Sequence, residues 1–246
     1  MVIYRLSLLD THETSRLLFY KFLSRIIGLP LTENTEYIAY RAKLAVYETD
    51  RLKISTINIK KFLVFIEDKD FYSHSGISYK SLARSLLGLI NVKPRSGGST
   101  IVQQLARTLF IKDLSKTKRR KFIELALAPW ITRVFSKDLI LDIYISSVRF
   151  ERRCFGVVAA MNHFWGNAEK SPTNAQAFFL IERVSNIRSK LLVNKIIETV
   201  RSAKENGLLS DEDIESLVDL YSDAVERGKI TADQAELLKL AEGVRA

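Results

Sequence analysis

The sequence predicts a mainly α-helical protein, and three observations carry this prediction. Of its 246 residues only 10 are Gly and 4 are Pro, fewer than a turn-rich β-sandwich needs. Apolar residues make up 47% of the chain, which excludes a disordered protein and allows one substantial core. These residues recur mainly at the spacing of amphipathic helices, whereas strand-like patterns are few.

The composition also narrows the class of partner. The chain carries a formal net charge of +10 and has a pI of about 9.6. Such a charge favours anionic partners, which include nucleic acid, phospholipid headgroups and phosphorylated substrates. The single cysteine, Cys154, excludes an intrachain disulfide and a cysteine-based metal site.

Residues 1–43 are expected to form an N-terminal helical segment. The chain begins without the charged start, apolar run and small-residue cleavage site of a signal peptide. Its most membrane-like stretch, Arg16 to Leu31, is interrupted by Lys21 and Arg25 and is shorter than the roughly 20 residues that span a bilayer. Two interpretations are open: this helix lies in a membrane interface, or it packs on its own domain.

Further helices are expected in close succession. The stretch ISTINIKKFLVFIE, residues 54–67, should begin extended and become a buried helix near Lys60. Ser78 can cap a helix that runs to about Asn91, and the loop NVKPRSGG follows. The patterns then predict helices near residues 100–111, 116–135, 137–147, 155–165 and 173–185.

Residues 189–246 differ in character and predict a tail of two or three short helices. Gly207 and Gly228 suit the C-terminal ends of helices. Ser210 with Asp213, and Thr231 with Gln234, have the spacing of N-terminal capping boxes. The tail carries no catalytic pattern, so we interpret it as a packing or partner module.

The stretch SGGSTIVQQLARTLF, residues 96–110, places a glycine-rich turn before an amphipathic helix. Thr100, Gln104 and Arg107 share one face of that helix. Gly97 and Gly98 allow close approach of a ligand to the backbone, and the helix N-terminus carries partial positive charge. This arrangement suits phosphate or sugar hydroxyls, although a capped surface helix has the same pattern.

Two further segments carry candidate carboxylates. Glu67 and Asp68 follow the apolar run FLVFI, and partial desolvation of such a carboxylate suits it to general base work. The alternative is an ordinary helix end with exposed acids. Arg120 and Lys121 precede Glu124 by one helical turn, which keeps cations beside this glutamate. The alternatives there are a salt-bridged surface helix or a basic targeting run.

Together these segments resemble the peptidoglycan glycosyltransferases, glycosyltransferase family 51. This family comprises the transglycosylase domain of class A penicillin-binding proteins and their monofunctional relatives. The first three family motifs are matched in full and in order: Glu-Asp-x-x-Phe-x-x-His-x-Gly, Gly-Gly-Ser-Thr-x-x-Gln-Gln and Arg-Lys-x-x-Glu. The fourth, Lys-x-x-Ile-Leu-Glu-x-Tyr-Leu-Asn, is matched in part. The matching residues are Glu67, Asp68, Phe71, His74, Gly76, Gly97, Gly98, Ser99, Thr100, Gln103, Gln104, Arg120, Lys121, Glu124, Lys137, Ile140, Leu141, Asp142 and Tyr144.

The resemblance covers about Leu44 to Ile187 and implies a fold, an activity and roles. The fold would be a lysozyme-like helical lobe with a small membrane-facing jaw, near which Leu86, Leu87, Leu89 and Ile90 would fall. The activity would be polymerisation of lipid II into β-1,4 glycan strands with release of undecaprenyl pyrophosphate. Glu67 and Glu124 would be the catalytic residues: Glu67 would deprotonate the acceptor 4-hydroxyl, and Glu124 would help to position the pyrophosphate.

The same resemblance implies the ligands. A divalent cation, Mg²⁺ or Mn²⁺, would assist at the pyrophosphate, with no metal site built from the chain's own ligands and no organic cofactor. Arg107 stands where the family usually has Lys, so the positive charge is kept but its geometry differs. The implied substrate-binding residues are Asp68, Phe71, His74, Gly97, Gly98, Ser99, Thr100, Gln104, Arg107, Arg120 and Lys121.

Several positions depart from the family pattern. Ser146 replaces the Asn of the fourth motif, and Arg149 and Glu151 replace the Tyr and Gly that follow it. Gln176 stands where the fifth motif generally has Glu, and Pro129 should interrupt and kink the helix of the third motif. Both implied catalytic glutamates are present, so the departures concern mainly the scaffold.

We therefore predict a divergent, monofunctional peptidoglycan glycosyltransferase. Its domains would be residues 1–43, 44–188 (the glycosyltransferase domain) and 189–246. The expected partners are lipid II, the growing glycan strand, an anionic membrane surface and, through the tail, other cell-wall synthesis proteins. The expected place is the periphery of the bacterial inner membrane, with no spanning anchor and no transpeptidase domain.

Three other functions agree less well with the sequence. The main alternative is a relative without turnover that binds lipid II or serves as a scaffold, because the fourth and fifth motifs are altered. Nucleic-acid binding through the basic run at 116–121 lacks a recognisable fold or interleaved aromatic residues, so no nucleic acid is expected. A lysozyme-like hydrolase disagrees with the second motif, which serves transfer from a lipid-linked donor.

Overall fold

The computed structural model describes residues 44, 46–78, 99–110, 117–151, 153–185 and 191–245. All of these belong to one compact unit, Leu44–Ala246. The predicted interfacial helix at Arg16–Leu31 and the predicted helix from Ser78 to Asn91, which contains the jaw residues, lie outside the described residues, apart from Ser78 itself. Within the described ranges no helix is long and apolar enough to cross a membrane.

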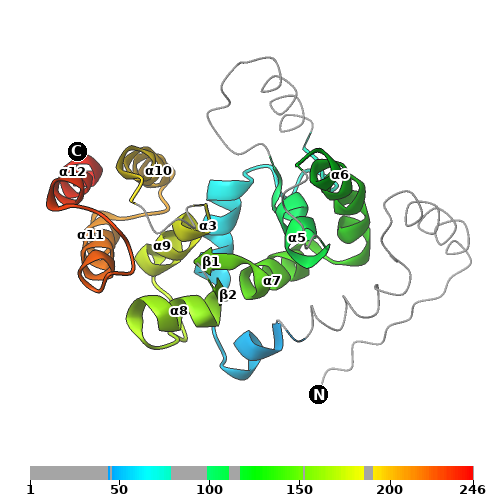
Figure 1. Cartoon of the computed structure of the whole chain (residues 1–246), viewed down its shortest axis with the longest axis horizontal. Coiled ribbons are helices and arrows are strands. Elements are labelled where there is room, and N and C mark those ends of the chain that lie inside the picture. Colours follow the sequence, from blue (N-terminus) through cyan, green and yellow to red (C-terminus); the bar gives the residue numbers. More distant parts are fainter. Residues whose placement is uncertain are drawn as a thin grey trace, which may run out of the picture. The chain divides into compact units, whose positions relative to one another are not determined.

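The described part of the chain is mainly α-helical, which confirms the predicted fold class (Figure 1). The first half of the unit contains α3 (Ile57–Glu67), α5 (Ile101–Phe110), α6 (Thr117–Val134) and α7 (Lys137–Ser147). A short hairpin, β1 (Arg149–Glu151) and β2 (Cys154–Phe155), precedes α8 (Val157–Trp165) and α9 (Asn174–Ser185). The chain then forms α10 (Val193–Glu205), α11 (Asp211–Glu226) and α12 (Gln234–Arg245). The five helices predicted between residues 100 and 185 are confirmed, each with ends close to those expected.

The hairpin is the element that the sequence patterns do not predict. Its strands pair antiparallel, with Arg149 opposite Phe155 and Glu151 opposite Cys154, and the register is irregular between these pairs. Strands of three and two residues are too short for an alternating pattern to show. Gly156 follows the hairpin with φ +79, and a Cβ there would lie 2.6 Å from the Ser146 carbonyl oxygen.

The core places α3 and α5 at the centre of the site-bearing part. On α3, Ile59, Phe62 and Leu63 are fully buried, and the Phe62 ring meets Phe178 of α9 edge to face at 5.7 Å. The apolar face of α5 packs against α6 and α7 (Figure 1). Burial of each CH₂ group contributes about 0.8 kcal/mol, so these apolar faces fix how α5 is oriented. Its polar face is thereby directed towards the end of α3.

Pro129 does not interrupt α6, contrary to the expectation from the sequence. The helix continues from Thr117 to Val134 with Pro129 inside it. Proline removes one backbone hydrogen bond from a helix. Here Ala128 and Trp130 on either side are buried, and tertiary packing of this kind can hold a helix through such a loss.

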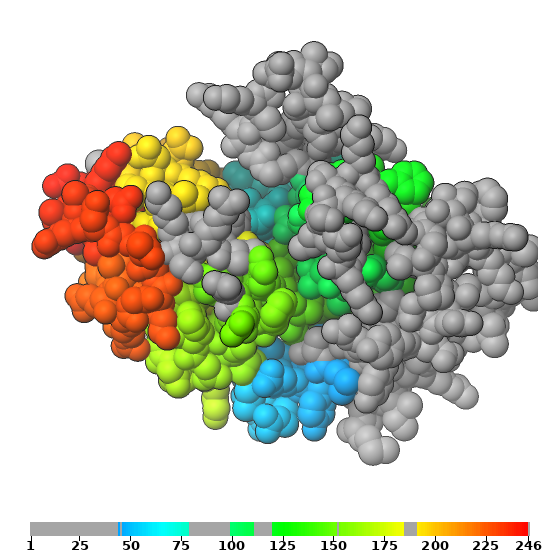
Figure 2. Space-filling view, viewed as in Figure 1, coloured from blue at the N-terminus to red at the C-terminus, as the bar shows by residue number. Residues whose placement is uncertain are grey.

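The C-terminal helices pack on the remainder of the unit through α9 and α11. In Figure 2 the orange and red surfaces of α11 and α12 adjoin the yellow and yellow-green surfaces of the preceding elements. Gly207 and Gly228 have φ of +66 and +64 and follow helix ends, as predicted. The predicted domain limits at 43 and 188 stay predictions.

The two predicted capping boxes have different outcomes. The box of Ser210 and Asp213 is present at the start of α11. At α12 the box of Thr231 and Gln234 is wrong, because the helix begins at Gln234 and its box is formed by Asp233 and Glu236. The Thr231 carbonyl instead accepts a hydrogen bond from the Leu191 amide.

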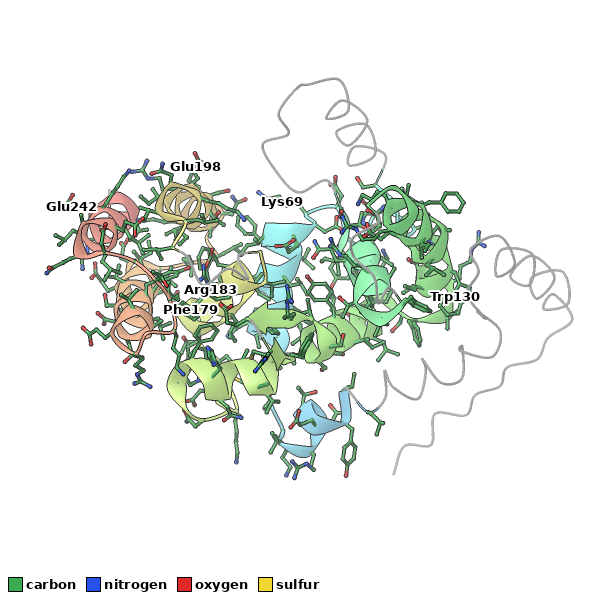
Figure 3. The ribbon with its side chains drawn as sticks, viewed as in Figure 1. Lys69, Trp130, Phe179, Arg183, Glu198 and Glu242 are labelled. Atoms are coloured by element: carbon green, nitrogen blue, oxygen red, sulfur yellow. The ribbon has the colours of Figure 1, made fainter. Side chains whose placement is uncertain are left out.

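A buried ion pair lies where α9 meets α11. Glu182 Oε2 accepts hydrogen bonds from Arg183 Nε at 2.8 Å and Nη2 at 2.7 Å, and from the Tyr221 hydroxyl at 3.1 Å. The side chains of Arg183 and Glu182 are 0% and 4% exposed. Phe179, labelled with Arg183 in Figure 3, packs on the Tyr221 ring at 4.9 Å. Burial, followed by the Glu182 charge, holds the pKa of Tyr221 well above its usual value.

Candidate active site

The loop after α3 is joined to the start of α5 by Asp68. The Asp68 side chain is buried, and its Oδ2 accepts a hydrogen bond from the Ile101 amide at 3.1 Å. Thr100 and Gln103 form a reciprocal pair at the same helix end, each side chain bonded to the other's amide. The amides of Thr100, Ile101 and Gln103 therefore have acceptors within the protein. The positive end of α5, which the sequence suggested for phosphate, is already met by the Asp68 carboxylate.

His74 fixes the other side of Asp68. Its Nδ1 accepts a hydrogen bond from the Gly76 amide at 3.0 Å, so the ring proton of the neutral form lies on Nε2. Nε2 lies 2.9 Å from Asp68 Oδ2 and 3.1 Å from Oδ1, and donates to this carboxylate. Asp68 and His74 thus connect the loop of the first motif to the helix start of the second motif. Their predicted substrate-binding role stays a prediction.

Gly76 and Thr100 form a second connection between the loop after α3 and the start of α5. The Thr100 hydroxyl is buried and donates to the Gly76 carbonyl at 2.7 Å. Gly76 has φ +97, and a Cβ there would lie 2.5 Å from the Ala128 carbonyl oxygen of α6. The family glycine is therefore required both by its backbone conformation and by the close approach of α6.

Lys137, at the start of α7, binds backbone carbonyls of the loop that follows α3. Its ammonium group donates to the carbonyls of Phe71 and His74, each at 2.6 Å, and lies 4.4 Å from the centroid of the buried Phe71 ring. Burial lowers the pKa of Lys137, while the Asp68 charge acts in the opposite direction. Phe71, predicted as a substrate contact, is 0% exposed and packs inside the loop.

Glu67, the predicted base, stands at the end of α3 and is half-buried. The Gln104 amide nitrogen donates to Glu67 Oε2 at 2.7 Å. The Tyr144 hydroxyl of α7 in turn donates to Gln104 Oε1 at 2.7 Å. Burial, followed by the Glu67 charge, holds the pKa of Tyr144 well above its usual value, and Arg107 acts in the opposite direction. The hydroxyl of Tyr144 is therefore a donor at any physiological pH.

Glu124, the second predicted carboxylate, is fully buried on α6 and is surrounded by cations. Lys121 Nζ lies 2.9 Å from its Oε2, while Arg120 Nε and Arg107 Nε lie 3.5 and 3.7 Å from its Oε1. Lys121 also donates to the Ser99 hydroxyl. Among the described residues, three positive charges thus face the one negative charge of Glu124.

One face of α5 reaches both glutamates. Gln104 contacts Glu67 and Arg107 contacts Glu124, and these two side chains are neighbours at i and i+3. Such neighbours have Cβ atoms about 5–6 Å apart. The helix therefore brings the Glu67 carboxylate and the cationic cluster to adjacent positions. Thr100, the third member of the predicted stripe, turns to the loop instead.

Two residues that contribute to the site were predicted only as matches to the fourth motif, without a role. Lys137 and Tyr144 lie seven residues apart, at i and i+7, and therefore on one face of α7. That spacing was the available signal. Gly97 and Gly98 were predicted to approach a ligand closely, and they lie outside the described residues.

The donor set does not fit a metal ion held by the protein. Among the described residues no group of three or more His, Cys, Asp and Glu side chains converges. The carboxylate of Glu124 is faced by three cations, whereas Mg²⁺ sites need oxygen ligands without competing positive charge. The expected Mg²⁺ or Mn²⁺ stays a prediction, and no step below is assigned to it.

Two side chains of the altered fourth and fifth motifs, Asp142 and Gln176, support the scaffold. Gln176 forms a reciprocal capping pair with Thr173 at the start of α9. Asp142, in place of the family Glu, binds Lys60 at 2.7 Å and accepts a hydrogen bond from Thr56. These side chains tie α7 to α3 and close the start of α9, and none of the contacts involves Glu67 or Glu124.

Comparison with known proteins decides the family. A family model described as transglycosylase matches residues 40–205, about two thirds of the chain. The chain belongs to the transglycosylase family. The match includes every element from α3 to α10, and therefore the whole of the site described above.

Individual relatives within the transglycosylase family are moderately similar. Penicillin-binding protein 2D of Bacillus subtilis is 35% identical over 130 residues, which cover 52% of this chain and 19% of the relative. Biosynthetic peptidoglycan transglycosylase of Neisseria meningitidis serogroup C is 33% identical over 148 residues, covering 57% and 63%. Penicillin-binding protein 1A of Neisseria lactamica is 30% identical over 152 residues, covering 59% and 19%. The chain thus spans about a fifth of the penicillin-binding proteins and under two thirds of the transglycosylase.

Proposed function

We propose that this protein is a peptidoglycan glycosyltransferase that polymerises lipid II into β-1,4 glycan strands and releases undecaprenyl pyrophosphate. The observation that carries the proposal is the juxtaposition on α5 of Glu67 and the Glu124 cluster. Glycosyl transfer from a pyrophosphate donor needs a base for the acceptor and positive charge for the leaving group. The family and the names of its members agree with this reaction.

The reaction follows from these two sites. Glu67 takes the proton from the acceptor 4-hydroxyl as the oxygen attacks C1 of the donor sugar. The bond from C1 to the pyrophosphate oxygen breaks, and the released pyrophosphate carries the negative charge away. Arg107, Arg120 and Lys121 meet that charge as it develops, and Glu124 keeps the three cations together.

The proposal is tested by polymerisation of lipid II in detergent, read as glycan chain length. In Glu67→Gln the side chain keeps its volume but cannot accept the proton, so the rate should fall by roughly 10²- to 10⁴-fold. Glu198→Gln is the matched control, because Glu198 is exposed on α10 (Figure 3). Near-full activity in Glu67→Gln would remove the base assignment.

The same experiment separates the enzyme from the scaffold alternative. Purified wild-type protein that binds lipid II without extending it would support a binding protein without turnover. The Ser146 and Gln176 departures are the sequence observations that favour this second candidate.

We also propose that the protein acts at an anionic membrane surface, as a peripheral protein of the bacterial inner membrane. The support is the net charge of +10, because basic residues near an anionic surface contribute on the order of 1 kcal/mol each. Co-sedimentation with phosphatidylglycerol vesicles should be strong at 0.1 M salt and weaker at 1 M, as the Debye length falls from about 10 to about 3 Å. Absence of sedimentation at low salt would mean that a partner provides membrane access.

A further inference from the structure

Three side chains from three helices form a continuous line that ends on Glu67. The Tyr144 hydroxyl donates to the Gln104 carbonyl oxygen, and the Gln104 amide nitrogen donates to Glu67 Oε2, both at 2.7 Å. The members are 40 and 37 residues apart in sequence, so only the folded protein brings them together. Tyr144 is fully buried, and its hydroxyl is linked to Glu67 through the Gln104 side chain.

The chemistry of an amide makes this line directional. The oxygen of a glutamine side chain only accepts hydrogen bonds, and its nitrogen only donates them. A Tyr144 donor at the oxygen therefore turns the nitrogen towards Glu67. In the reversed orientation the amide oxygen would face a carboxylate oxygen, and two acceptors repel. Tyr144 and ionised Glu67 thus select the same orientation of Gln104.

We infer that Tyr144 and Gln104 are positioning residues that hold the Glu67 carboxylate correctly aimed for proton abstraction. The inference rests on the proposed function, because it assigns these residues to the base of that reaction. A hydrogen bond donated to the charged form of a carboxylate favours that form. It also fixes the plane of the carboxylate, because one of its oxygens is held at a set position.

The central test is the pair of variants Tyr144→Phe and Gln104→Leu in lipid II polymerisation. Tyr144→Phe keeps the buried ring and removes only the hydroxyl, so kcat should fall by up to about tenfold, the size of one lost hydrogen bond between neutral groups. The KM for lipid II should change by less than about twofold, because uniform substrate binding is not altered. The pH–rate profile should also differ from that of wild type, because Gln104 no longer holds a fixed orientation beside the Glu67 carboxylate.

Two comparisons distinguish positioning from general destabilisation. Tyr221→Phe removes another buried tyrosine hydroxyl, one that binds Glu182 instead, and should lower stability without changing kcat or the pH profile. In the Gln104→Leu background, adding Tyr144→Phe should have little further effect on kcat, because Tyr144 acts through Gln104. Equal kcat and pH profiles for Tyr144→Phe and Tyr221→Phe would overturn the inference, as would fully additive effects.

A second readout does not depend on turnover. The side-chain amide signals of Gln104, assigned by their loss in Gln104→Leu, should shift in NMR spectra as Glu67 is protonated on acidification. That response should vanish in Glu67→Gln and differ from wild type in Tyr144→Phe. If wild-type protein fails to polymerise lipid II while the amide titrates in this way, the proposed function fails and the positioning of Glu67 stands. Amide signals that do not respond to Glu67 would overturn the inference even in an active enzyme.

Discussion

The clusters around the buried carboxylates of Glu182 and Glu124 differ in the cations that face them and in their exposure. Glu182 pairs with the buried Arg183, and Tyr221 donates a hydrogen bond to the same Glu182 oxygen. At Glu124, three cations face one carboxylate. The Glu182 pair is shielded from solvent, whereas the side chains of Arg107 and Lys121 beside Glu124 are about a third exposed and can meet an anion. The difference indicates that the first cluster serves the scaffold, and it supports the proposal that the second binds an anionic ligand.

The largest effect should come from unbalancing the pair on α9. Glu182→Gln leaves the Arg183 cation buried against a neutral amide, and removing one partner of a buried pair typically costs about 3–5 kcal/mol of unfolding free energy. The measurement is guanidinium denaturation. Replacing both residues in Glu182→Leu with Arg183→Leu should recover most of that loss, because no charge is left unpaired. A single variant as stable as wild type would contradict the scaffold role.

A smaller effect, on ligand binding and not on stability, is expected at the Glu124 cluster. Arg107→Ala removes one of three cations and should weaken binding of a soluble prenyl pyrophosphate by roughly 1.5–3 kcal/mol in calorimetric titration. Its unfolding free energy should stay within about 0.5 kcal/mol of wild type, because like charges are relieved as one contact is lost. Arg133→Ala, at an exposed arginine of the same helix as Glu124, is the matched control. Equal affinities in the two variants would mean that Arg107 is only a surface side chain.

The smallest effect should be the response to salt, and it should again separate the two clusters. Arg107 and Lys121 are about a third exposed, so raising ionic strength from 0.1 to 1 M should weaken prenyl pyrophosphate binding several-fold as the Debye length falls from about 10 to about 3 Å. The stability difference between wild type and Glu182→Gln should hardly change, because a buried pair is screened little. Salt-independent pyrophosphate binding would argue against a cationic site.

Much of the helical framework could be predicted because its signals are local. The helices at α5 to α9 follow from apolar spacing and from start and stop residues, and their ends fall where these signals place them. The hairpin at Arg149–Phe155 could not be predicted, because its strands are too short to show a period. The capping box of α12 was assigned to the wrong residues, because Asp233 with Glu236 has the same spacing as Thr231 with Gln234 and suits a capping box equally well.

The candidate site was predictable to a different extent. The motif pattern identified Glu67, Gln104, Arg107 and Glu124 as candidate site residues. It did not distinguish residues whose side chains are exposed at the site from residues that hold the loop after α3 in place. Whether a side chain is exposed or bound to the backbone depends on distant contacts, such as that of Asp68 with the Ile101 amide. For the same reason the Glu182 pair was not foreseen, since its third member, Tyr221, lies in the tail.

The Lys137 contacts have a consequence for synthesis on the ribosome. Lys137 holds the carbonyls of Phe71 and His74, which are 66 and 63 residues earlier in the chain. Loop closure over such separations is slow compared with helix formation, and a growing chain gains residues at about 5–20 per second. The nascent protein therefore carries Glu67 and Asp68 for several seconds before the residue that secures their loop has been translated. During that interval the loop that carries the first motif lacks its contacts with Lys137, so its final conformation forms only after α7 has been translated.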